Sequence, residues 1–567
     1  MRLKNLCAAV FVLMALACTD PLTVDNSNDP DRGRVFTNPA DLQVFIAGLY
    51  GVWLNSTIGG SNDGLQTQLI VMGMENTSTL ANFAMGPRGS IPRNPITNQR
   101  GSQGNAGNYH DWFRGHRAAR QAALGIASLK DITLGSAAAD ARALAFARLV
   151  QGLALGNLSL AYDSASILTE NDNPEADAAV VVPLSPYPAV NAAALGYLDS
   201  AIAVAQANPG AFPLPTTANF WINGIAMSQA DFIRLARSYK AQFRAGVART
   251  PAERAAVDWA KVIADADAGI TANLAPNMDP TNGWDISWVV QHYTTGAGAW
   301  HQMSQFWIGM ADSSGGYNAW LNTPPNSRVP FLVVTPDKRF PGGANCVAPC
   351  PSSARTTQGS AAGTGSAGQP FANTPYFRNR PPGDDVSGDP LQISMYDFWR
   401  SRQFRQANRI GPYPIMTRAE IRLLAAEGYL RTGNFAAAIA RIDSSRVTIG
   451  GLPSLVGIAD TLTPVPGSAV NCVPKVPDET QAYKTSRCGR IWDALKWEYR
   501  METAYTGYGM WFFAARGWGD LPQNTAYQWP VPFNEMDARR QAFYGFGGGG
   551  PSSAGPGNYG LFPNGVY

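Results

Sequence analysis

A helical hairpin between residues 417 and 446 constrains the fold of this 567-residue chain more than any other feature. The sequence TRAE at 417–420 is a capping box, and it starts a helix that stops at Gly433. Asn434 then caps a second helix, which ends near Gly450. Small Ala residues let the two helices approach closely, in the layout of a tetratricopeptide hairpin. The inward positions are Ile421, Leu424 and Ala425 in the first helix and Ala438, Ile439 and Ile442 in the second.

Capped helical segments also occur earlier in the chain. Asn191 is expected to cap one helix, and residues 229–247 form another. The sequence TPAE at 250–253 is a second capping box, with Pro at the first helical position. The expected inward positions are Leu195, Leu198, Ile202 and Ala205 after the first cap, and Ala256, Trp259, Ala260 and Ile263 after the capping box.

Large loop-rich segments separate these helix pairs, so a regular solenoid is not expected. The main insertions span about 275–390 and 450–486. We therefore predict a mainly α fold, a tetratricopeptide-like helix-pair scaffold with large loop-rich insertions. The scaffold is expected to form a single domain over 37–545, followed by a Gly-rich C-terminal tail at 546–567.

The first residues predict export. Arg2 and Lys4 precede an apolar run at 6–17, which has the length of a signal-peptide core. Cys18 follows small residues, as in bacterial lipoproteins, so we expect a signal peptide at 1–17, lipid on Cys18 and a tether at 18–36. Ala-Leu-Ala at 15–17 also fits ordinary cleavage, which would release a soluble protein. No later segment is expected to span a bilayer.

Cysteine counting supports the lipid and suggests two disulfides. Four cysteines remain besides Cys18 once Cys7 leaves with the signal, so an exported chain can pair them and leave Cys18 for acylation. Proximity favours Cys346–Cys350 and Cys472–Cys488, although three connectivities stay open. A metal site is the alternative, but C-x-x-x-C without a nearby His pair is not a zinc spacing, and no metal is expected.

Charge and motifs exclude several function classes. The chain has 44 Lys and Arg against 41 Asp and Glu, with no basic run, so a nucleic-acid partner is not expected. It contains no nucleophile elbow, zinc-protease motif or phosphate-binding loop, and its four His residues form no obvious metal set. No cofactor and no catalytic residue is predicted. A carboxylate pair for glycoside hydrolysis stays open, because such a pair needs only to meet in space.

Five segments occur in an order that matches a known family. They are 141–162 (ARALAFARLVQGLALGNLSLAY), 229–270, 413–427 (YPIMTRAEIRLLAAE), 498–521 with its WFFAARGWGDL, and 529–537 (WPVPFNEMD). In this order, behind a lipoprotein-like signal, the chain resembles the SusD/RagB family of outer-membrane nutrient-binding lipoproteins. Two positions depart from the family pattern. Ala514 stands near the place of an acidic residue, and Ala15 stands where the lipidation signal usually has Leu.

The resemblance implies a non-catalytic protein that is lipid-anchored in the outer membrane and exposed on the cell surface. Proteins of this family capture oligosaccharide or peptide and deliver it to a SusC-like, TonB-dependent outer-membrane transporter. The expected partners are thus the transporter, a glycan or peptide ligand, and the membrane through the lipid. A protein-interaction scaffold of the cell envelope and a surface glycosidase are the alternatives.

Aromatic residues in the first insertion are the predicted ligand contacts. Sugars stack their CH faces on such rings, and this stretch is loop-like and lacks helical periodicity. For any single ring, packing onto the scaffold is the favoured interpretation, whereas one or two are expected to line a ligand site. Core packing is expected for Tyr109, Trp112 and Phe113, and a structural role for Trp511, Phe512 and Trp518. The candidate contacts are Trp284, Trp288, Tyr293, Trp300, Trp307, Tyr317 and Trp320.

Overall fold

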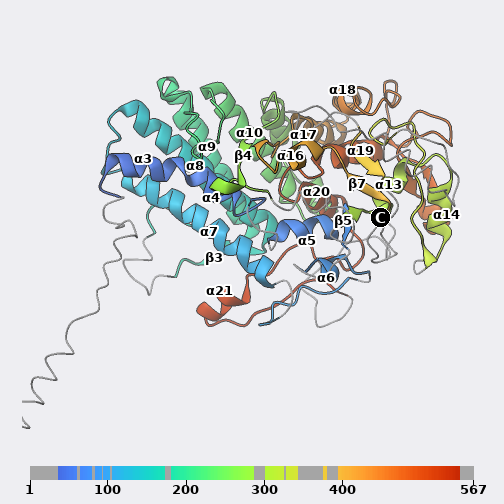
Figure 1. Ribbon diagram of the computed structural model, residues 1–567, viewed down its shortest axis with the longest axis horizontal. Helices are drawn as coiled ribbons and strands as arrows, with labels where there is room; N and C mark the ends of the chain where they lie inside the picture. The colour runs from blue at the N-terminus through green and yellow to red at the C-terminus, as the bar shows by residue number, and fades with distance from the viewer. Residues whose placement is uncertain are drawn as a thin grey trace, which may run out of the picture.

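Paired α-helices form the scaffold of the protein, in two groups that follow each other along the chain (Figure 1). The computed structural model describes residues 36–59, 64–78, 84–91, 93–101, 105–172, 181–286, 301–324, 327–341, 375–379 and 394–548. Within these residues the strands are two or three residues long and pair only in twos. The predicted fold class, a mainly α helix-pair scaffold with loop-rich insertions, is confirmed.

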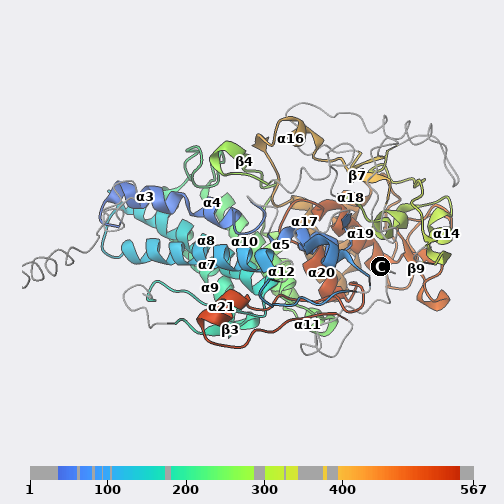
Figure 2. The same ribbon diagram turned by 60° about the horizontal axis from the view of Figure 1, so that its bottom comes forward.

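The helix α8 (Ala137–Ala161) is the centre of the first group and is buried along most of its length. It packs between α7 (Asn105–Ser128) and α9 (Tyr187–Ala207), and the three run side by side in Figures 1 and 2. Ser136 caps α8, because its hydroxyl accepts a hydrogen bond from the backbone N–H of Ala139. Two shorter helices, α3 (Pro39–Ala47) and α4 (Leu49–Leu54), also contact α7 and α8.

Two glycines let α8 approach its neighbours closely. A Cβ atom on Gly156 would lie 2.2 Å from Cε2 of Phe243 in α10 (Gln229–Gly246). A Cβ atom on Gly152 would lie 2.8 Å from Cγ of Leu198 in α9. Both distances are far shorter than van der Waals contact, so only glycine fits without moving the partner side chain. Because Gly152 and Gly156 have no side chains, α8 can lie this close to α9 and α10.

The start of α9 differs from the prediction. The helix begins at Tyr187, with Pro188 in its first turn, so the prediction that Asn191 caps it is wrong. Asn191 instead lies inside the helix and is buried, and its Nδ2 donates to Oγ of Ser159 at 3.0 Å and to the carbonyl of Phe243 at 3.3 Å. A polar residue that can cap a helix is used here to join three helices.

Length and composition alone would let α8 and α9 span a bilayer, contrary to the sequence-based expectation. In the most apolar 18-residue window of α8, 89% of the residues are buried inside the protein. The corresponding share for α9 is 39%. The apolar surface of α8 is therefore used against protein neighbours, as in the core helix of a large domain.

The second group contains the predicted hairpin, now seen as α17 (Arg418–Arg431) and α18 (Phe435–Arg446). Thr417 accepts a hydrogen bond from the N–H of Glu420, and Asn434 caps α18, so both predicted starts are confirmed. The predicted inward residues of α18 are buried. Packed around the hairpin are α10, α12 (Trp259–Asp267) and α19 (Ile491–Thr503), and α20 (Met510–Trp518) contacts α10 and α19.

The second capping box gives a shorter helix than predicted. Thr250 caps α11 (Pro251–Ala255), but that helix ends after one turn. Asp258 then caps α12, because its carboxylate accepts from the N–H of Lys261. The predicted inward face is therefore confirmed for Trp259, is only partly buried at Ile263, and is wrong for Ala256 and Ala260. The buried residues are Trp259, Val262, Asp265 and Ala266, whereas Ala256 and Ala260 are exposed.

The described residues from 301 onward in the first insertion pack at the end of the second group, where α13, α14 and β7 gather in Figures 1 and 2. Residues 275–286 instead lie beside the first group, where Trp284 stacks on Tyr50 of α4. A buried ion cluster fixes the first insertion to the second group. Arg339 Nη1 and Nη2 donate to Glu498 of α19 at 2.6 and 3.0 Å, and Nη2 also donates to Asp337 at 2.8 Å. All three side chains are fully buried. Such a cluster tolerates no missing partner, because the remaining charge would lie unpaired in the core.

The other described elements are short. The helices are α5 (Leu65–Met72), α6 (Met85–Gly89), α13 (Gln305–Ile308), α14 (Gly316–Asn322), α16 (Arg402–Gln406) and α21 (Phe533–Ala538). The antiparallel strand pairs are β1 (Asn76–Ser78) with β5 (His301–Met303), β2 (Ser164–Ser166) with β3 (Leu184–Pro186), β4 (Asn277–Met278) with β8 (Gly411–Pro412), β6 (Phe377–Asn379) with β7 (Tyr396–Phe398), and β9 (Lys475–Pro477) with β10 (Ser486–Cys488).

One predicted disulfide is confirmed. Cys472 and Cys488 are bonded, with their Cα atoms 5.7 Å apart, and they join the second insertion to β10. Cys346, Cys350 and Cys18 lie outside the described residues, so their bonding stays a prediction. The first residues of the predicted C-terminal tail are ordered, because Phe546 forms an antiparallel bridge with Ile96.

The helix spacing predicts opposite effects for two glycine-to-alanine substitutions. Gly156→Ala forces the buried ring of Phe243 to move, so we expect the free energy of unfolding to fall by about 1–3 kcal/mol. Gly196→Ala in α9 is the control, because its Cβ would meet nothing within 4 Å. There the better helix propensity of Ala should raise stability by up to about 1 kcal/mol. Urea unfolding measures both, and equal effects would contradict the close-approach argument.

Candidate functional site

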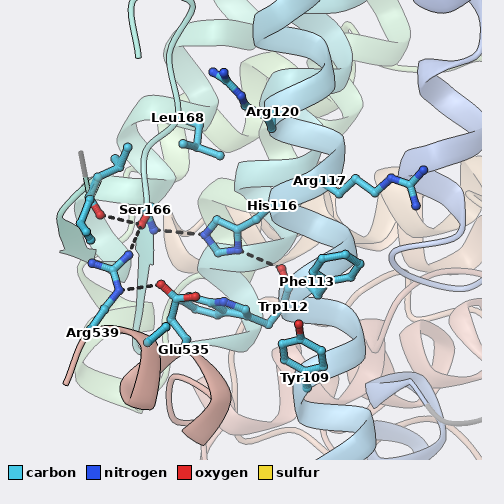
Figure 3. A pocket seen from close by; sticks show the side chains of 13 residues that line it. Tyr109, Trp112, Phe113, His116, Arg117, Arg120, Ser166, Leu168, Glu535 and Arg539 are labelled. Carbon is cyan, nitrogen blue, oxygen red and sulfur yellow. Dashed lines mark hydrogen bonds and ion pairs between the residues drawn. The ribbon is translucent and has the colours of Figure 1, made fainter. Parts of the chain in front are cut away.

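A cavity of about 440 Å³ lies along the face of α7 that α8 leaves open (Figure 3). Its walls are α7, the chain that follows β2, residues 181–182, and α21 with the residue after it. Figure 2 shows α21 beside β3 and α7, although hundreds of residues separate them in sequence. The lining residues are Tyr109, Trp112, Phe113, His116, Arg117, Arg120, Ser166, Leu168, Val181, Val182, Glu535, Ala538 and Arg539.

Helical spacing explains why α7 carries this cavity. Tyr109, Phe113, Arg117 and Arg120 follow one another at intervals of three or four residues, which places them along one side of the helix. The opposite side is made of buried alanines and a glycine, which suits close packing against α8. A Cβ atom on Gly115 would lie 3.0 Å from Cδ2 of Leu158. The helix is thus held by α8, α3 and α4 and carries the cavity on the side of Tyr109 and Phe113.

Two aromatic rings form the open floor of the cavity. The side chains of Tyr109 and Phe113 are 37% and 49% exposed, and their ring centroids lie 5.6 Å apart with an angle of 25° between the planes. The prediction of core packing is therefore wrong for these two residues. It is confirmed for Trp112, which is 3% exposed and packs edge-to-face on Tyr162. The sequence shows that Tyr109 and Phe113 are four residues apart, which places them on one face of a helix. Only the structure shows that this face is exposed.

His116 joins α7 to the strand wall. Its Nε2 accepts a hydrogen bond from the backbone N–H of Ser166 at 3.2 Å, so the ring proton lies on Nδ1, which donates to the carbonyl of Trp112 at 2.9 Å. Burial disfavours a charged ring and lowers the pKa of His116 to about 4. Both ring nitrogens are used in the neutral state, so His116 holds the wall in place rather than exchanging protons near neutral pH.

An ion pair closes the wall on the side of α21. Arg539 Nε donates to Glu535 at 2.6 Å, and its Nη2 donates to Oγ of Ser166 at 3.1 Å. The Ser166 hydroxyl in turn donates to the carbonyl of Val182 at 3.2 Å. These contacts tie α21 to the chain on both sides of the cavity. Their result is a pocket whose polar groups are fixed before any ligand enters.

The predicted ligand contacts lie elsewhere. Trp288, Tyr293 and Trp300 fall outside the described residues. The other four are buried in the core, at 3% exposed for Trp284, 0% for Trp307, 1% for Tyr317 and 4% for Trp320. Buried rings offer no face to a ligand from solvent, so these four support the packing interpretation. None of them lines the α7 cavity, and their role as ligand contacts stays a prediction.

The contacts of these buried rings are protein contacts. Trp284 stacks on Tyr50 at 6.2 Å, and Trp307 meets Phe377 edge-to-face at 5.4 Å. Tyr317 stacks on Trp320 at 6.2 Å. The predicted structural role is confirmed for Trp511 and Phe512, which are buried in α20. Among the described residues, no three His, Cys, Asp or Glu side chains gather into a possible metal site.

Known structures share this architecture. A SusD superfamily protein from Parabacteroides distasonis aligns with a TM-score of 0.52 and 10% sequence identity, over 88% of this chain and 98% of that chain. A SusD superfamily protein from Bacteroides vulgatus aligns with a TM-score of 0.51 and 12% identity, over 86% and 89%. This chain has the SusD fold. The resemblance predicted from the sequence is therefore confirmed at the level of the fold.

Sequence comparison adds nothing to the structural likeness. No protein-family model matches the chain, and no curated protein matches it. At 10–12% identity the SusD fold is shared without any shared binding residue being implied. What this chain binds must therefore be argued from its own cavity.

The partly buried His116 predicts an acid-dependent loss of stability. Its pKa in the folded state, about 4, is below the ordinary value of 6.5, so the unfolded chain takes up a proton first as the pH falls. The contribution of the neutral ring is complete above pH 6.5 and is lost between about 6.5 and 4, to a total of at most about 3 kcal/mol.

Urea unfolding of wild type and His116→Gln at pH 7 and pH 4.5 checks this. The variant keeps a neutral polar side chain but cannot titrate, so the stability difference between the two proteins should narrow at the lower pH. A constant difference across this range would show that His116 does not titrate below its ordinary pKa.

Proposed function

We propose that this protein is a surface-exposed lipoprotein that captures oligosaccharide in the α7 cavity and delivers it to a TonB-dependent outer-membrane transporter. The observation that carries the proposal is the open Tyr109–Phe113 pair in a preformed cavity. The SusD fold and the lipoprotein-like signal before Cys18 support the same assignment.

The two rings suit a sugar better than a purely apolar ligand. Their planes differ by 25° and both rings are partly exposed, so each offers apolar ring surface to a ligand in the cavity. A pyranose has an apolar CH face that stacks on such a surface, while its hydroxyls point to the sides. Arg539, Glu535 and the Tyr109 hydroxyl stand at the cavity as polar groups for those hydroxyls. The cavity volume of about 440 Å³ lies within the usual range for small-ligand sites, roughly 300–1,000 Å³.

The described lining of this cavity lacks the pair of carboxyl groups that a glycosidase uses. That reaction needs two carboxyl groups on opposite sides of the glycosidic bond. Among the described residues that line the cavity, Glu535 is the single carboxylate, and it is bonded to Arg539. A bound glycan at this place would thus meet a binding surface, which supports capture without turnover.

Substitution of the aromatic floor tests the glycan site. Tyr109→Ala and Phe113→Ala each remove one stacking face, so the affinity for a bound oligosaccharide should fall about fivefold to tenfold. Calorimetry with hits from a glycan array measures this. Val456→Ala is the matched control, because that side chain is 78% exposed and lies outside the cavity.

Trp307→Ala separates this site from the aromatic stretch of the first insertion. Because Trp307 is fully buried, its removal should lower the free energy of unfolding by about 3–5 kcal/mol. Glycan affinity of the folded fraction should stay unchanged. If Trp307→Ala abolished binding in folded protein while Tyr109→Ala did not, the α7 cavity would not be the site.

Anchoring depends on Cys18 in this proposal. Cys18→Ser removes the thiol that carries the lipid, and the protein should then move from the outer-membrane fraction to a soluble fraction. Fractionation of cells grown with labelled palmitate measures both position and lipid. Label that stays on the variant, or a variant that stays on the membrane, would contradict an anchor at Cys18. Co-purification of a TonB-dependent transporter with wild type tests the partner.

A further inference from the structure

We infer that the α7 cavity selects acidic glycans, those that carry uronate or sulfate groups, over neutral ones. The inference rests on the proposed function and narrows its ligand class. It comes from the charges around the aromatic floor, which are unequal. Arg117, Arg120 and Arg539 line the cavity, against the single carboxylate of Glu535.

The negative charge of Glu535 is already compensated by an ion pair. Its Oε1 accepts from Arg539 Nε at 2.6 Å, on the same helical turn. An anionic ligand therefore meets no uncompensated negative charge among the described residues that line the cavity. A neutral sugar gains little from this arrangement, because its hydroxyls hydrogen-bond equally well to uncharged amides.

Arg117 supplies the principal attraction. It lies one turn after Phe113 on α7 and is exposed, and Figure 3 shows its side chain extending from α7 on the side away from Ser166 and Arg539. No Asp or Glu among the described residues lies within ion-pair distance of its guanidinium. A sugar stacked on Phe113 would bring an acidic substituent at its edge within reach of this side chain. The guanidinium fork matches carboxylate and sulfate with two parallel hydrogen bonds.

Arg539 supplies a second donor at the opposite wall. Glu535 and Ser166 hold its Nε and Nη2, so the guanidinium plane is fixed. Its Nη1 makes no hydrogen bond in the described part of the protein, and it remains for a ligand. Arg120 is turned to the backbone, since its Nη1 donates to the carbonyl of Asp172. Arg539 thus offers one preorganised N–H, with its charge balanced by Glu535, whereas Arg117 offers an adaptable cation that has no ion-pair partner among the described residues.

A glycan fits these groups better than an acidic peptide. An extended peptide would need backbone partners along the strand wall. There the N–H of Ser166 is bonded to His116, and its hydroxyl is bonded to Val182. The strand β2 also pairs with β3 over its whole length. Ring faces and side-chain cations are what the cavity offers, and an acidic sugar uses both.

The decisive comparison is between trigalacturonate and its methyl ester, which share ring faces but differ in charge. Calorimetry with the full-length mature protein is run at 20 mM and 500 mM NaCl. We expect trigalacturonate to bind at least about tenfold more tightly at low salt, and the preference to shrink at high salt because the charges are then screened. A sulfated oligosaccharide with its desulfated form, and a Glu-rich peptide, complete the set.

Variants assign the preference to the cavity. Arg117→Gln should reduce the affinity for the acidic ligand about tenfold and leave that for the methyl ester within about twofold. Arg117→Lys should recover part of the loss, because it restores the charge without the fork. The control is Arg418→Ala on α17, which removes an exposed arginine outside the cavity. This variant should bind the acidic ligand and the methyl ester as tightly as wild type does.

The outcomes separate the two proposals. Equal binding of acidic and neutral partners, with Tyr109→Ala reducing both, overturns the charge selection and leaves glycan capture intact. Tighter binding of the Glu-rich peptide than of any acidic glycan also overturns the inference. If no glycan of either kind binds, both the proposed function and the inference of charge selection are contradicted. Circular dichroism confirms that each variant is folded.

Discussion

The close packing of α8 against its neighbours is the constraint on which the rest of the structure depends. Gly152 and Gly156 leave no room for a Cβ atom against α9 and α10, and Gly115 of α7 does the same on the other side. Helices at this distance bury almost all of the apolar surface of α8. Since α8, α3 and α4 hold α7, the side that carries Tyr109 and Phe113 is left to form a binding surface.

The α7 cavity combines this rigid floor with walls that come from distant parts of the chain. His116 bonds to Ser166, and Ser166 bonds to Arg539 near the C-terminus. The hydrogen bonds within the wall fix the orientation of these side chains, so a ligand meets groups that are already oriented. Buried charges likewise fix a loop segment in the second helix group, where Arg339 holds the first insertion against α19. In both helix groups, polar contacts thus fix segments that have little regular secondary structure.

Local signals predicted the scaffold well and the exposure of side chains poorly. The caps at Thr417 and Asn434 were found because a capping residue acts on backbone groups two or three positions away. Asn191 has the same chemistry, but its partners Ser159 and Phe243 lie on other helices, so the local pattern predicts a cap that does not form. The inward positions of α12 were predicted only in part because Asp258 interrupts the helix that Thr250 begins.

The sequence by itself determined the helix pairs, the loop-rich insertions and the SusD-like order of motifs, and it favoured the Cys472–Cys488 disulfide among three connectivities. Only the tertiary structure decided which aromatic rings face solvent. Trp307 and Trp320 lie in a loop-rich segment yet are buried, whereas Tyr109 and Phe113 lie in a helix of the scaffold yet are open. The physical reason is that the exposure of a ring depends on what covers it. The covering residues come from elsewhere in the chain, where no local pattern reports them.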